Sequence, residues 1–168
     1  MQAVHSGIVI SSFQYASGDA VGRRDHPSPF SAGTLALQHP HFRARGIDLE
    51  ALVPGLRWGT INLSLGRELV LERPDFTAEA VDWTQEEKTR IAPETFSFVR
   101  CCFICPLPDA EGRFGYYPGL LYYPHPETKP QTNEHHYDVL EILAQNVPGV
   151  APGVRADIVC RRDAFRDR

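Results

Sequence analysis

The chain has 168 residues, of which 42% are hydrophobic and 23% charged, and its formal net charge is −4. This length suits one domain that buries an apolar core without disulfides or metal ions as cross-links. The acidic balance disfavours a general nucleic-acid binder, because such proteins hold phosphate backbones through many Lys and Arg contacts.

The sequence predicts one domain over residues 1–168, with a core at about residues 6–160 and a basic, solvated tail at residues 161–168. No run approaches the roughly 20 consecutive apolar residues of a membrane helix, and the first residues lack the basic and apolar regions of a secretory signal. We therefore expect a cytoplasmic protein without membrane or nucleic-acid partners, present as a monomer or small homo-oligomer.

Several segments have the composition of β-strands, since they are short, rich in β-branched or aromatic residues, and bounded by Gly, Pro, Asn or Asp. In chain order they are Ser6–Ser12, Gly59–Leu65, Glu68–Leu71, Thr95–Ile104, Leu120–Tyr123 and Tyr137–Leu143. A Pro-Asp pair and a glycine within residues 106–112 predict a hairpin loop. The pattern as a whole predicts a mainly β protein, either a barrel or a sandwich.

Helices are expected to be few and short, because 14 prolines are dispersed through the chain. Pro40 in a first turn with Gly46 past the end predicts one helix, capped by one of the two histidines that flank Pro40. Thr84 followed by Glu87 has the spacing of a capping box and predicts the start of another helix.

The four cysteines include Cys102 and Cys105 at a C-x-x-C spacing, which is compatible with a zinc or redox site. No second C-x-x-C or spaced histidine pair completes such a site. Cys101 lies beside them in the same apolar run, and Cys160 is distant in the chain. Buried free thiols are the favoured interpretation.

The order of the strand segments and two short motifs carry a resemblance to a known family. The run GTINL at residues 59–63 is similar to a GTLN-L motif, and LEILA at residues 140–144 is similar to an I-E-I-I-A motif. Both motifs belong to the archaeal CTP-dependent riboflavin kinases, which the chain resembles from Gly7 to about Val159. The resemblance implies a small, closed, six-stranded cradle-loop barrel, mainly β, with a few short helices.

The resemblance also implies a set of site residues. Thr60 and Asn62 correspond to the family's magnesium ligands, Asn62 and Glu141 to its catalytic groups, and Thr132 and Glu141 to its flavin-binding groups. Residues two apart on a strand point to one face, so a hydroxyl and a carboxamide oxygen can meet one hard cation. The alternative is structural: Thr60 as a strand former, Asn62 bonded to a neighbouring loop, and Glu141 facing solvent.

A nucleotide site is implied at Ser17 and Gly18 in the loop after the first strand, with Arg57, Gln145 and Asn146 as further contacts. The chain has no G-x-x-x-x-G-K-[ST] motif, so backbone amides and a metal ion would hold the phosphates. Mg²⁺ is the expected cofactor, and no tightly bound organic cofactor is predicted.

The segment from Tyr122 to Pro130 concentrates reactive side chains between prolines that keep the backbone extended. His125, Glu127 and Lys129 are therefore candidate pocket residues. The imidazole and carboxylate, two residues apart, can form a general acid–base pair or bind a metal ion. The alternative is a proline-rich surface loop with aromatic packing.

Three functions follow from these patterns. The first is Mg²⁺-dependent transfer of a phosphoryl group from a nucleoside triphosphate, CTP in the family, to riboflavin or a related small hydroxyl substrate. The second is a non-kinase barrel that has lost the nucleotide loop and binds a small ligand or regulates, since fold and function separate easily. The third is a metal-dependent hydrolase or lyase that uses His125 and Glu127.

Overall fold

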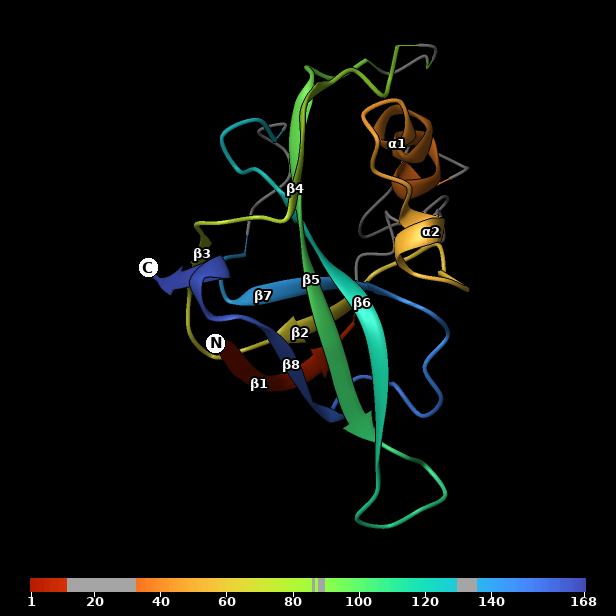
Figure 1. Ribbon diagram of the computed structural model, residues 1–168, viewed down its shortest axis with the longest axis vertical. Coiled ribbons are helices and arrows are strands. Elements are labelled where there is room, and N and C mark those ends of the chain that lie inside the picture. The colour runs from red at the N-terminus through yellow and green to blue at the C-terminus, as the bar shows by residue number, and fades with distance from the viewer. Residues whose placement is uncertain (12–32, 86, 88–89, 130–135) are drawn as a thin grey trace.

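The computed structural model describes residues 1–11, 33–85, 87, 90–129 and 136–168 (Figure 1). Its strands are β1 (Gln2–Ile10), β2 (Ile61–Ser64), β3 (Leu69–Leu71), β4 (Phe76–Val81), β5 (Glu94–Pro106), β6 (Phe114–Pro124), β7 (Val139–Ala144), β8 (Arg155–Arg161) and β9 (Phe165–Asp167). The helices are α1 (Thr34–Arg43) and α2 (Leu49–Leu52), with a 3₁₀ turn at Arg162–Ala164. The described chain is mainly β, as the sequence predicts.

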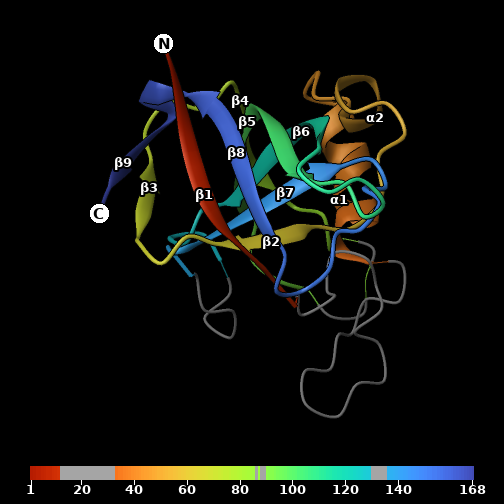
Figure 2. The same cartoon turned by 90° about the horizontal axis from the view of Figure 1, so that it is seen from below.

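Six of the strands close into an antiparallel barrel in the order β5-β6-β7-β2-β1-β8. Closure occurs where β8 pairs with β5, from Cys101 opposite Cys160 to Ile104 opposite Asp157. Figure 2 shows the barrel with α1 and α2 beside it. The prediction of a closed, six-stranded barrel is confirmed, and the sandwich alternative is excluded.

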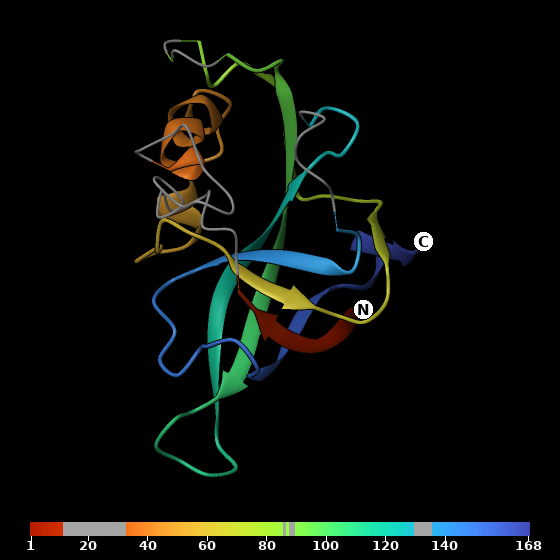
Figure 3. The ribbon, with the colours of Figure 1, turned by 180° about the vertical axis from the view of Figure 1, so that it is seen from behind.

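Strand β5 is longer than the barrel requires, and its two halves have different partners. Its 13 residues span roughly 40 Å at the usual rise per residue. The C-terminal half pairs with β8, whereas the N-terminal half pairs with β4, for example Phe76 opposite Phe98. Strands β4, β5 and β6 therefore form a sheet that extends beyond the barrel and faces the helices (Figures 1 and 3).

Two hydrophobic cores follow from this arrangement. The barrel interior takes alternate residues of each strand, such as Leu140 and Ile142 of β7. The second core lies between the helices and the extended sheet, where the ring of Phe42 meets those of Phe96 and Phe98 at centroid distances of 5.3 and 5.1 Å. Because Leu143 belongs to the second core, the outward face of β7 points toward the helices.

Helix α1 differs from the prediction at its start. It begins at Thr34, with Gly33 as its N-cap residue, so Pro40 lies inside the helix and not in its first turn. Both histidines that flank Pro40 are likewise inside, and the prediction that one of them caps the helix is wrong. Burial of Leu35 and Phe42, both fully inaccessible, stabilises the longer helix in spite of the proline.

The predicted capping box at Thr84 is also wrong, because the described residues around it contain a turn and no helix. The Thr84 hydroxyl accepts a hydrogen bond from the Ile91 amide at 3.0 Å, and the Glu87 amide donates to the Thr84 carbonyl at 3.0 Å. A threonine hydroxyl can accept a hydrogen bond from the backbone of a loop as well as from the first turn of a helix, and the local sequence does not distinguish the two uses.

The C-terminal residues are folded where a solvated tail was expected. Strand β9 pairs with β3, and Phe165 is buried against the barrel core. The arginines of this segment face solvent, and two of them form ion pairs with acidic residues near β3, Arg166 with Glu72 at 3.1 Å and Arg168 with Glu68 at 3.0 Å. One apolar side chain and a short strand pairing therefore order a segment whose composition is mostly charged.

All four cysteines are free, with Cys105 and Cys160 buried and Cys101 and Cys102 partly buried. Burial raises the pKa of the Cys160 thiol to about 11, which keeps it protonated near neutral pH. Among the described residues, no helix has both the length and the apolar character needed to span a membrane.

Candidate active site

Three polar side chains line up across neighbouring strands on the outside of the barrel. Asn62 of β2 lies opposite Glu141 of β7, and Glu141 lies opposite Tyr122 of β6. Directly opposed residues in antiparallel strands share a face, with Cβ atoms about 4.5–5.5 Å apart. We call Asn62, Glu141 and Tyr122 the polar row; β2 and β7 are seen side by side in Figure 3.

The predicted magnesium pair is in direct contact at one end of the polar row. The Thr60 hydroxyl donates a hydrogen bond to Asn62 Oδ1 at 2.9 Å. The Thr60 oxygen keeps its lone pairs, and the Asn62 oxygen keeps one further acceptor position. Both side chains are partly buried, so they are held in place while solvent still reaches them.

Glu141 occupies the centre of the polar row in a partly buried position. Burial raises the pKa of its carboxyl group, while the charges of Lys129 and His136 act in the opposite direction. Burial also raises the pKa of Glu94, and the charge of Lys129 again acts in the opposite direction. The Glu94 carboxylate accepts a hydrogen bond from the Trp83 ring nitrogen at 2.7 Å. Lys129 thus brings positive charge from the loop after β6 to the polar row.

Tyr122 connects the polar row to helix α1. Its hydroxyl donates a hydrogen bond to Gln38 Oε1 at 2.9 Å, and both side chains are buried. Burial raises the pKa of Tyr122 well above its usual value, so the hydroxyl stays protonated and remains a donor. Neither residue stands out in the sequence as a site residue; the local signal for the pair is a glutamine on the buried side of α1.

The first strand ends beside Asn62, because Ile10 lies opposite Asn62 in the pairing of β1 with β2. The nucleotide loop predicted by the resemblance follows this point in the chain. Its candidate residues Ser17 and Gly18 lie outside the described residues, and so does the candidate flavin contact Thr132.

The other candidate nucleotide contacts gather at the end of β7. The Arg57 amide donates to the Ala144 carbonyl at 2.9 Å, and Leu56 forms a β-bridge with Gln145. Arg57, Gln145 and Asn146 are exposed. Glu141 precedes Ala144 by three residues on the same strand, which corresponds to roughly 10 Å. The candidate nucleotide contacts therefore begin at the end of the strand that carries Glu141.

His125 and Glu127 form a hydrogen-bonded chain with two hydroxyl groups. Glu127 Oε1 lies 3.0 Å from His125 Nδ1, His125 Nε2 lies 2.8 Å from Ser97 Oγ, and Ser97 Oγ lies 2.8 Å from Thr77 Oγ1. An ionised carboxylate only accepts, so Nδ1 donates to Glu127, while the Ser97 hydroxyl can accept from Nε2 or donate to it. We call Thr77, Ser97, His125 and Glu127 the hydroxyl–imidazole chain.

The hydroxyl–imidazole chain has the residue types of a nucleophilic triad but not the access that one needs. Ser97 is fully buried, so no substrate reaches its hydroxyl in this arrangement. Both ring nitrogens of His125 already have partners, which leaves none for a metal ion. The described contacts instead fix the loop that follows β6, and with it Lys129, to strands β4 and β5.

No protein-family model, no curated protein and no solved structure matches the chain. The closed barrel is compatible with the fold that the resemblance to riboflavin kinases implies.

Proposed function

We propose that the chain catalyses Mg²⁺-dependent transfer of a phosphoryl group from a nucleoside triphosphate to a hydroxyl group of a small substrate, riboflavin or a related compound. The single observation that supports this most is the meeting of Thr60, Asn62 and Glu141 on one face of the barrel. These residues come from two motifs far apart in the chain, and the resemblance implies one shared site for them.

The donor set at this face fits a hard cation. A threonine hydroxyl and an asparagine carboxamide oxygen are oxygen ligands of the kind Mg²⁺ prefers, and two protein ligands leave positions for water and phosphate. When bound, the ion would neutralise the negative charge of the transferring phosphoryl group. Thr60 and Asn62 would hold it beside the end of β1, where the predicted nucleotide loop begins.

Glu141 is suited to act as the general base. The substrate oxygen attacks the γ-phosphorus, its proton passes to the Glu141 carboxylate, and the bond from the γ-phosphorus to the bridging oxygen breaks, releasing the nucleoside diphosphate. Burial raises the pKa of this carboxyl toward neutrality, which makes it a stronger base once ionised. The positive charge of Lys129 favours the ionised form and attracts the anionic donor.

Arg57, Gln145 and Asn146 are the residues that would contact the phosphate donor. The family's A-P-x-x-L-R segment after the glutamate strand corresponds here to residues 144–149, which contain no arginine. Arg57 reaches the same end of β7 from the segment before β2 and can supply the missing guanidinium. Because the positive group comes from a different segment, the base of the preferred nucleotide need not be cytosine.

The test is an assay for FMN formation from riboflavin with CTP, ATP, GTP or UTP, each with and without Mg²⁺. Asn62→Ala is expected to abolish Mg²⁺-dependent turnover, since it removes one metal ligand and the partner of Thr60. Ser64→Ala, two residues further along β2, is the matched control and should keep turnover. Equal rates for Asn62→Ala and wild type would exclude this site as the centre of phosphoryl transfer.

A thermal melt separates the proposal from the second function expected from the sequence. A ligand at about 100 times its dissociation constant stabilises the native state by roughly 2.7 kcal/mol. A rise in melting temperature with riboflavin alone, combined with no FMN formed from any of the four donors, would identify a flavin-binding barrel without kinase activity. Shifts with both flavin and a nucleotide are the result expected of the enzyme.

A further inference from the structure

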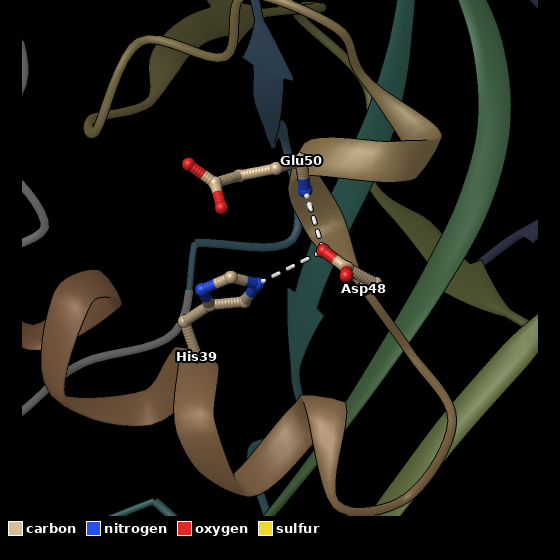
Figure 4. A group of neighbouring side chains, drawn as sticks. All are labelled: His39, Asp48 and Glu50. Atoms are coloured by element: carbon tan, nitrogen blue, oxygen red, sulfur yellow. Dashed lines mark hydrogen bonds and ion pairs between the residues drawn. The ribbon is translucent and has the colours of Figure 1, made fainter.

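A second group of polar side chains lies on the helices, outside the polar row. His39 of α1, Asp48 before α2 and Glu50 of α2 each offer one possible ligand atom, and these atoms all lie within 4.8 Å of one another. Figure 4 shows the imidazole and the Asp48 carboxylate facing each other, with the Glu50 carboxylate alongside. We call these three residues the helix cluster.

His39 is the unusual member of the helix cluster. Its side chain is only 8% exposed, and among the described residues its Nε2 atom makes no hydrogen bond. The atom points at Asp48 Oδ1 from 3.4 Å, which is too long for a strong charge-assisted hydrogen bond. A buried ring nitrogen left in this state is costly, so a further partner at this point would stabilise it.

The distance of 3.4 Å has a natural explanation if both atoms bind one metal ion. Zinc binds imidazole nitrogen and carboxylate oxygen at about 2.0–2.2 Å, and two such ligands on a tetrahedral ion lie roughly 3.4 Å apart. The pair is therefore already spaced as one edge of a tetrahedron. Glu50 is exposed and free of packing constraints, so its carboxylate can reach a third corner.

The surroundings of the helix cluster hold two of its members in place. Asp48 Oδ1, the oxygen that faces His39 Nε2, accepts hydrogen bonds from the Glu50 and Ala51 amides at 3.2 and 3.4 Å, so a metal ion would share this oxygen with the two amides. The ring of Trp58 packs against that of His39 at a centroid distance of 5.0 Å. Arg43 Nε lies 3.4 Å from Asp48 Oδ2 and would offset part of the negative charge that attracts a cation.

We propose that His39, Asp48 and Glu50 bind one divalent transition-metal ion, with Zn²⁺ as the best match, and that water fills the fourth position. One neutral imidazole and two carboxylates suit this class of ion better than Mg²⁺, which prefers an all-oxygen set. The ion joins α1 to α2 across the turn at residues 44–47. This site shares no ligand with Thr60 and Asn62, and it does not depend on the proposed phosphotransferase activity.

The full-length chain, freed of metal with a chelator, is titrated with Zn²⁺ alone and followed by calorimetry and by amide chemical shifts. The expected result is one ion per chain, with shifts centred on residues 39 and 48–51. Affinity should fall as the pH is lowered, because a protonated imidazole cannot bind metal. Shifts centred on the thiols at residues 101–105 would place the ion elsewhere and overturn the proposal.

The key variant is Glu50→Gln, which removes one ligand from an exposed position and leaves the buried packing unchanged. We expect a loss of affinity of at least about tenfold, and a larger loss for His39→Gln. Glu111→Gln, at another exposed carboxylate in the turn between β5 and β6, is the control and should bind as the wild type does. Equal Zn²⁺ affinity in wild type, Glu50→Gln and Glu111→Gln would overturn the proposal.

Discussion

Asn62 and Glu141 lie directly opposite each other on β2 and β7, although about 80 residues separate them in the chain. The pairing places a carboxamide and a carboxylate on the outer face of the barrel, between the end of β1 and Tyr122. A one-residue slip in this register would turn both side chains into the barrel interior, where Leu63 and Leu140 now pack. The register of the barrel core therefore also fixes the candidate site.

Replacing Glu141 with Gln should change stability in a pH-dependent way. Burial raises the pKa of Glu141, so the folded chain holds this proton to higher pH than the unfolded chain does. The corresponding stability is fully present below the unfolded pKa of about 4.3 and is lost as the pH rises through the raised value. Since Gln resembles the protonated acid, Glu141→Gln should melt higher than wild type at about pH 8.

The two proteins should melt together at about pH 3, well below the unfolded pKa, where the wild-type carboxyl is protonated in both states. Calorimetric scans across this range test the prediction. A variant that melts below the wild type at about pH 8 would mean that ion pairing of Glu141 outweighs its burial. In the same pH series, the wild-type rate of phosphoryl transfer should rise as Glu141 ionises, and the variant should show no such rise.

Tyr122→Phe should destabilise the fold by about 1–3 kcal/mol, because it leaves the buried Gln38 oxygen without its donor. Urea unfolding at neutral pH measures the change. Tyr116→Phe is the control, since Tyr116 lies on the same strand and is 67% exposed. A loss for Tyr122→Phe no larger than that of the control would show that the Tyr122–Gln38 bond contributes no net stability.

Ser97→Ala tests the interpretation of the hydroxyl–imidazole chain as a structural device. The change removes the hydrogen-bond partner of both His125 Nε2 and Thr77 Oγ1, and we expect a loss of about 1–3 kcal/mol. Hydrolysis of an activated ester such as p-nitrophenyl acetate should be the same in variant and wild type. An esterase activity that disappears in Ser97→Ala would instead identify Ser97 as a nucleophile that a rearrangement exposes.

Gly7→Ala should weaken the barrel where β1 crosses β2. A Cβ atom at Gly7 would lie 2.4 Å from the Ser64 carbonyl oxygen and 2.8 Å from Leu63 Cγ, so the strands would have to move apart. Overpacking of this kind costs about 1–3 kcal/mol, and each kcal/mol lowers the melting temperature by roughly 2–4 °C. Ser6→Ala, at the exposed neighbouring position, is the control and should melt like the wild type. If Gly7→Ala also melted like the wild type, the close approach of Gly7 to Ser64 and Leu63 would be contradicted.

The sequence predicts those parts of the fold that have a local signal. The strands that line the barrel alternate or contain β-branched runs, and composition predicts five of the six. Strand β8 is not among the five, and β6 begins at Phe114, six residues before the predicted Leu120. Strand β4 was missed, because Glu79 and Ala80 are poor strand formers and Ala80 takes a positive φ of 47° at a register shift. Pairing with β5, which local composition does not encode, makes this segment a strand.

Some residues of the candidate site could likewise be predicted from the sequence, and others could not. The resemblance identified Thr60, Asn62 and Glu141, and the register of β2 with β7 brings Asn62 and Glu141 together. Ser97 and Tyr122 were not recognised as hydrogen-bonding partners, because each lies in an apolar run and bonds to a residue far away in the chain. A local sequence pattern predicts to which face of a strand a side chain points, whereas its hydrogen-bond partner depends on how the helices and strands pack together.

The division of β5 between two cores bears on how the molecule unfolds. Its N-terminal half supplies Phe96 and Phe98 to the layer under the helices, and its C-terminal half supplies Phe103 to the barrel interior. Melting either layer frays the same strand and exposes apolar surface in both. The helical layer and the barrel are therefore expected to lose their structure in one cooperative transition, with slowly exchanging amides along the whole of β5.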